Sequence, residues 1–86
     1  MNHTKFYEKL LALPNGANYV SYKKQRYLLR KETLLEGKLI KIYAEDLSSQ
    51  DIVSGNYYPT MKDGMLKPCE ISDEKIIHFV LHATVQ

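Results

Sequence analysis

The stretch NYVSYKKQRYLLRKETL, residues 18–34, decides how the rest of this chain is interpreted. Tyrosine, valine and leucine recur in two short runs on either side of a polar break, KKQ, at residues 23–25. Such residues favour strands, and two such runs around a short break predict an antiparallel hairpin. The break lacks the Asn-Gly or Asp-Gly pair preferred in two-residue hairpin turns, so the sequence leaves the turn type open.

Further strand-like runs follow the hairpin. Residues 38–47 alternate apolar and polar side chains, and residues 52–59 include Gly55, which suggests a bulge or a close backbone contact. Residues 65–69 are short, and Pro68 restricts them to the edge or the end of a sheet. Because the links between successive runs are short, we expect an antiparallel meander of four to five strands.

Two segments have the apolar spacing of amphipathic helices. Residues 4–13 place Phe6, Leu10 and other apolar side chains on one side, and Pro14 ends the segment. Residues 72–83 show the same pattern and begin with serine and aspartate, which commonly cap helices. Each helix has one apolar face, so both should cover the same side of the sheet. The predicted fold is an α+β domain of order α-β-β-β-β-α, and residues 1–86 form a single small domain.

Composition excludes several classes of protein. Hydrophobic residues make up 44% of the chain and charged residues 26%, which is ordinary for a globular domain and argues against disorder. No apolar run approaches the roughly 18 residues of a membrane-spanning helix, so we expect no membrane partner. A single cysteine cannot form an internal disulfide, and small secreted domains usually carry several cysteines. The sequence therefore predicts a cytoplasmic protein.

The charge layout is the clearest functional signal. Residues 1–42 hold nine of the twelve Lys and Arg residues, whereas residues 43–86 hold seven of the ten acidic residues. Much of the positive charge lies in the hairpin, among tyrosines. Basic side chains contact phosphates or carboxylates, and aromatic rings stack on bases. The candidate binding residues are Lys23, Lys24, Arg26, Tyr27, Arg30 and Lys31. The alternative is a solvated outer sheet face, since a net charge of only +2 is far from that of a dedicated nucleic-acid binder.

Cys69 is the one candidate nucleophile. It precedes the second predicted helix, whose dipole lowers the pKa of a nearby thiol, so a thiol enzyme or redox sensor centred on Cys69 is the alternative function. Against this, Glu70 would raise the pKa of the thiol, and no Cys-x-x-Cys pair is present. Free cysteine is also among the most buried residue types, so packing is the favoured interpretation.

His78 and His82 lie four residues apart, a spacing that places both on one helical face and can chelate a metal. Zinc sites need three or four ligands, so two solvated histidines are the favoured interpretation and no metal is expected. Glu45, Asp46 and Asp51 cluster around one predicted loop without the spacing of a calcium loop.

No phosphate-binding loop or nucleophile motif is present, so we expect no cofactor. The sequence therefore favours a small non-catalytic cytoplasmic binding domain, with a nucleic acid or an acidic protein as its partner.

Overall fold

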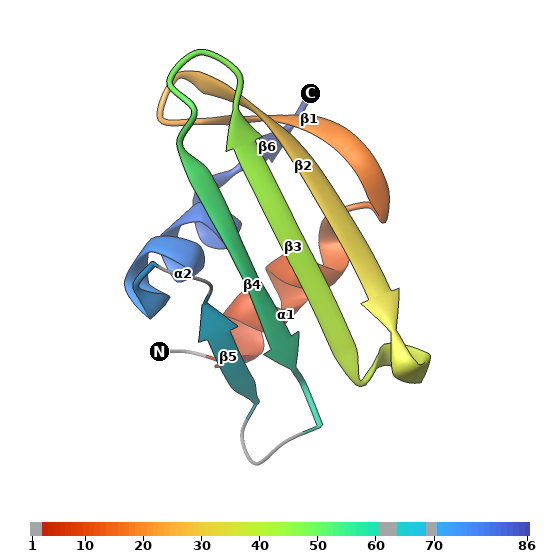
Figure 1. The fold of residues 1–86 in the computed structure, drawn as a ribbon. Helices are drawn as coiled ribbons and strands as arrows, with labels where there is room; N and C mark the ends of the chain where they lie inside the picture. Colours follow the sequence, from red (N-terminus) through yellow and green to blue (C-terminus); the bar gives the residue numbers. More distant parts are fainter. Residues whose placement is uncertain (1–2, 61–63, 69–70) are drawn as a thin grey trace.

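The computed structural model describes residues 3–60, 64–68 and 71–86 (Figure 1). The elements follow the order α1 (His3–Ala12), β1 (Gly16–Tyr22), β2 (Gln25–Leu34), the 3-10 turn η1 (Leu35–Gly37), β3 (Leu39–Asp46), β4 (Ile52–Tyr58), β5 (Met65–Pro68), α2 (Asp73–His82) and β6 (Thr84–Val85). The α+β class is confirmed. Neither helix in the described part of the chain has the length and apolar character needed to cross a bilayer.

The strands form one antiparallel sheet of order β5-β4-β3-β2-β1-β6. The meander from β1 to β5 is confirmed, but the sheet has a sixth strand, β6, that the sequence did not predict. A strand of two residues is too short to show alternation. β6 forms because α2 carries the chain from the β5 edge across the sheet to the β1 edge, where Val85 pairs with Val20. The pairing around Gly55 is continuous, so β4 contains no bulge there.

Both helices pack on one face of the sheet, and in Figure 1 α1 lies behind the strands while α2 lies beside β4 and β5. In the central parts of β1, β2, β3 and β4 every second residue is buried on the side of the helices, as the alternation of a half-covered sheet requires. These strand residues pack in one cluster with apolar residues of α1 and α2. The cluster comprises Phe6, Leu10, Leu13, Val20, Tyr22, Tyr27, Leu29, Ile40, Ile42, Ala44, Val53, Tyr57, Ile76, Phe79 and Val80.

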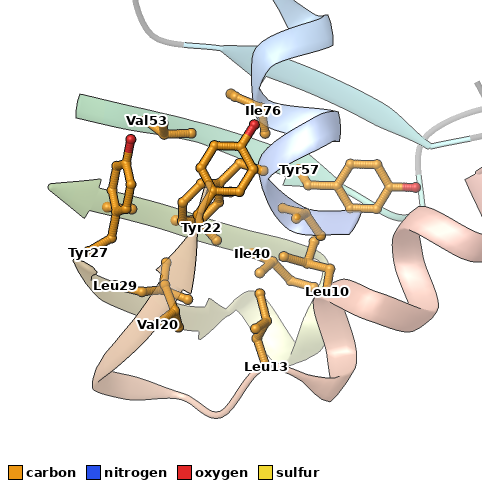
Figure 2. Close-up of a cluster of buried hydrophobic side chains, with 14 of the residues drawn as sticks. Leu10, Leu13, Val20, Tyr22, Tyr27, Leu29, Ile40, Val53, Tyr57 and Ile76 are labelled. Carbon is orange, nitrogen blue, oxygen red and sulfur yellow. The ribbon is translucent and has the colours of Figure 1, made fainter. Parts of the chain in front are cut away.

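Aromatic rings join the helices to the sheet. The ring of Phe79 on α2 lies 4.8 Å from that of Tyr22 and 5.2 Å from that of Tyr27, measured between centroids. On α1, Phe6 meets Tyr57 edge-to-face at 5.1 Å. Figure 2 shows these tyrosines among the aliphatic side chains of the core. Edge-to-face pairs contribute about 0.5–1.5 kcal/mol beyond their buried area, so the tyrosines of the hairpin stabilise the fold.

The β1–β2 hairpin turns through Lys23 and Lys24 alone, because Tyr22 pairs directly with Gln25. Both lysines have positive φ, 49° and 63°. Two-residue turns of type I′ require positive φ at both central positions. A left-handed conformation costs an ordinary L-residue roughly 1–2 kcal/mol, so this turn is strained.

Replacing this turn by Lys23→Asn/Lys24→Gly should stabilise the protein by about 1–2 kcal/mol, since both new residues accept positive φ readily. The free energy of unfolding in urea, compared with that of the wild type, measures the effect. Lys38→Asn is the matched control, because Lys38 is exposed and has a φ of −80°, and it should change stability by less than about 0.5 kcal/mol. A hairpin variant no more stable than the wild type would contradict the strained turn.

Candidate functional site

The structure divides the six candidate binding residues of the hairpin between two environments. Those at the turn and on the outward side of β2 are exposed: Lys23, Lys24, Arg26 and Arg30. Tyr27 and Lys31 have the opposite strand parity and are buried, with 4% and 3% of their surface exposed. The predicted site is therefore split between the two faces of the sheet. Only its exposed part can meet a partner on the outer face.

Lys31 joins β2 to the end of α1. Its Nζ donates hydrogen bonds of 2.6 Å to the carbonyl oxygens of Leu10 and Leu13, and a longer one of 3.4 Å to that of Leu11. The last carbonyls of a helix lack partners within the helix and carry partial negative charge, so an ammonium group satisfies both needs. Burial lowers the pKa of Lys31. Lys31 is a structural residue that caps α1 from the sheet.

Lys31→Met should destabilise the protein by about 1–3 kcal/mol, because the variant keeps most of the side-chain volume but leaves buried carbonyls without a donor. Urea unfolding of both proteins measures the difference. Lys41→Met is the matched control on the neighbouring strand, since Lys41 is exposed on the outer face. Equal stability losses in the two variants would show that the cap contributes nothing.

The face of the sheet turned away from the helices, here called the open face, contains a shallow hollow of about 820 Å³. The hollow spans β2, β3, β4 and β5. Its charged and aromatic lining residues are Arg30, Glu32, Lys41, Tyr43, Glu45 and Lys67. Lys41, Tyr43 and Lys67 were not among the sequence candidates. The pairing of β2 with β3, and of β4 with β5, places these three residues near Arg30. The sequence alone does not give this register.

The charges in the hollow have no partners within the described structure. Arg30 lies opposite Tyr43 in the β2–β3 register, and Glu32 lies opposite Lys41. Although Glu32 and Lys41 face each other, they form no ion pair. The one ion pair between described residues joins Lys75 to Asp51, on the other side of the sheet. The basic and acidic groups of the hollow are therefore available to a ligand.

Tyr19, Tyr43 and Tyr58 have the strand parity of the open face, and the first two are exposed. Tyr43 is 40% exposed in the middle of the hollow and makes no ring contact with any described residue. Tyr19 on β1 is 44% exposed, and the guanidinium group of Arg26 lies 4.0 Å from its ring centroid. Arg26 and Tyr19 thus form a cation–π pair, whereas the ring of Tyr43 has no such partner.

The acidic residues at the end of β3 and in the β3–β4 link do not form one cluster. Glu45 points to the open face, whereas Asp46 is buried on the helix side. The carboxylate of Asp46 accepts hydrogen bonds from the backbone N–H and hydroxyl groups of Ser48 and Ser49. These bonds, led by the Ser48 N–H, lower the pKa of Asp46 to about 2. Asp46 therefore holds the β3–β4 link in shape.

Asp51 joins that link to two other elements. Its carboxylate accepts a hydrogen bond of 2.9 Å from the hydroxyl of Tyr27 and one of 2.6 Å from Nζ of Lys75 on α2. The hydrogen bond from Lys75 is the main cause of the lowered pKa of Asp51. Burial is the main cause of the raised pKa of Tyr27, and the hydrogen bond to Asp51 adds to it. All three polar groups are satisfied by one another, which indicates a structural role.

Acid should weaken the fold through these carboxylates. The folded-state pKa of Asp46 lies below its unfolded value, so its contribution is complete above about pH 4 and is lost as the pH falls toward 2. In Asp46→Asn, urea stability should be lower at pH 6 and should fall less between pH 4 and pH 2. Glu36→Gln, which removes a carboxylate from the exposed β2–β3 link, should keep the wild-type acid profile. Identical profiles for Asp46→Asn and the wild type would contradict this role.

The two histidines of α2 lie side by side, with ring centroids 4.3 Å apart. His78 Nδ1 lies 2.5 Å from the hydroxyl of Tyr22, and burial, followed by His82 and Lys23, lowers the pKa of His78. Within residues 3–60, 64–68 and 71–86, no three His, Cys, Asp or Glu side chains are grouped to hold a metal.

Cys69 lies outside the described residues, and so does its neighbour Glu70.

Comparisons of the chain with protein-family models, with curated proteins and with solved structures found no match.

Proposed function

We propose that this chain is a non-catalytic binding domain that binds single-stranded nucleic acid on the open face of its sheet. The observation that carries the proposal is the set of unpaired cations, Arg30, Lys41 and Lys67, around the exposed ring of Tyr43. Cations neutralise phosphates, and an exposed aromatic ring stacks on a base whatever its sequence.

The spacing of the cations suits an extended strand. Lys41 and Lys67 occupy one row across the sheet, because both pair with Asn56 of β4 from opposite sides. Adjacent strands lie about 4.8 Å apart, so the two lysines are separated by about 10 Å. Arg30 lies on β2, beside Lys41 and one row further along the sheet. The three cations thus surround the tyrosine on more than one side.

The remaining charge on the outward side of the hairpin supports the same surface. Arg26 lies on the same face of β2 as Arg30, and Lys23 and Lys24 extend from the turn at the end of that strand. The strained backbone of the turn is also consistent with selection for something other than stability. An acidic segment of a protein is the other partner with suitable charge, and an acidic peptide represents it in the titration.

An amide-resolved NMR titration with short mixed-sequence RNA and DNA tests the proposal. We expect shifts in β2, β3, β4 and β5 around the hollow, and none on the solvent side of α1. Three phosphate contacts predict that log K falls with log salt with a slope of about −2, at about −0.7 per contact. Shifts produced only by an acidic peptide would favour a protein partner, and an absence of shifts at low salt would remove nucleic acid as the ligand.

Matched charge variants locate the surface. Arg30→Gln/Lys41→Gln should weaken nucleic-acid binding. It should also make the slope of log K against log salt shallower by about 1.4, at about 0.7 per lost phosphate contact. Lys9→Gln/Lys38→Gln removes the same charge from exposed positions on α1 and in the β2–β3 link, and should leave the slope unchanged. Equal effects of the two double variants would mean that binding reflects net charge and not the open face.

A further inference from the structure

The hollow contains carboxylates as well as cations. A surface that bound only phosphates would gain nothing from Glu45 or Glu32, because each repels the backbone of a nucleic acid. Both side chains line the hollow, and neither forms an ion pair within the described structure. Unpaired carboxylates are hydrogen-bond acceptors only, so they fit a ligand that brings N–H donors.

The two carboxylates differ in their surroundings. Glu32 is exposed and lies opposite Lys41, whose charge offsets its own. Glu45 is half-buried, and its neighbours across the strands are the apolar residues Leu28 and Ile52. A hydrogen bond is stronger beside apolar groups than in open water. Glu45 is therefore the carboxylate better placed to discriminate between ligands.

Tyr43 lies between a cation and this carboxylate. Along β3, Lys41 precedes Tyr43 by two residues and Glu45 follows it by two, all three on the same face. Each is about 7 Å from Tyr43 along the strand, in opposite directions. A nucleotide stacked on the tyrosine ring with its phosphate toward Lys41 therefore presents the edge of its base toward Glu45.

We propose that the hollow binds one nucleotide of the strand and selects bases that carry an exocyclic amino group, cytosine over uracil in particular. The inference rests on the proposed function. Carboxylates accept hydrogen bonds from N4 of cytosine. Uracil presents a carbonyl oxygen at the same position, which is an acceptor and repels the carboxylate, and it offers only the single N3–H beside that oxygen as a donor. The two pyrimidines are alike in size and differ along this edge at ring positions 3 and 4, so their comparison tests the contact between the base edge and Glu45.

Fluorescence anisotropy of labelled oligocytidylate and oligouridylate of equal length tests the inference, at slightly alkaline pH so that cytosine stays neutral. We expect oligocytidylate to bind about fivefold more tightly or better. In Glu45→Gln the preference should fall to about one, because an amide both donates and accepts, and oligouridylate should bind more tightly than it does to the wild type.

Glu36→Gln is the control, because it removes the same charge from the exposed link before β3 and should keep the wild-type preference. Equal binding of the two oligonucleotides by the wild type would overturn the base selection and leave the proposed function intact. A preference that persists in Glu45→Gln, with an unchanged NMR spectrum of the rest of the protein, would overturn the assignment to Glu45. Binding of neither oligonucleotide would overturn the proposed function as well.

Discussion

The architecture depends on one constraint: both helices lie on the same face of the sheet. A strand presents successive side chains to opposite faces, so covering one face alone divides every strand into a buried and an exposed set. The buried set, with Phe6 and Phe79 from the helices, forms the core. The exposed set forms the open face. The core and the candidate site are thus two consequences of the same arrangement.

Three polar side chains buried or partly buried on the covered face, those of Lys31, Asp46 and Tyr27, are tolerated because each has a partner. Lys31 donates to the last carbonyls of α1, Asp46 accepts from two serines, and Tyr27 donates to Asp51. A buried polar group without a partner would cost more than these hydrogen bonds contribute, so the partners determine where such residues are allowed. Lys31 also gives α1 a fixed position against β2. The same lysine would be a surface cation if the helices covered the other face.

The open face contrasts with this. Its charges lack protein partners in the described structure, its tyrosine ring at position 43 is uncovered, and four strands contribute to one hollow. The proposed binding of a nucleic-acid strand gives these groups partners: phosphates for the cations, a base for Tyr43 and an amino group for Glu45.

The sequence by itself determined the class of fold. Apolar spacing located both helices, alternation and turn residues located the strands of the meander, and the short links implied antiparallel pairing. The two-residue period of a strand also separates Tyr27 and Lys31 from Arg26 and Arg30, although the predicted site contained all four. The sequence did not show which of the two strand faces the helices cover, because both sets contain charged residues.

Tertiary structure decided that question and three others. Lys31 is buried because the end of α1 supplies carbonyls to its ammonium group, a contact between residues about 20 positions apart. β6 exists because α2 returns the chain to the free edge of β1. Lys41 and Lys67 join Arg30 because strand register brings three strands to one hollow. Local patterns report which side of an element is apolar, but they carry no information on which distant element lies against it.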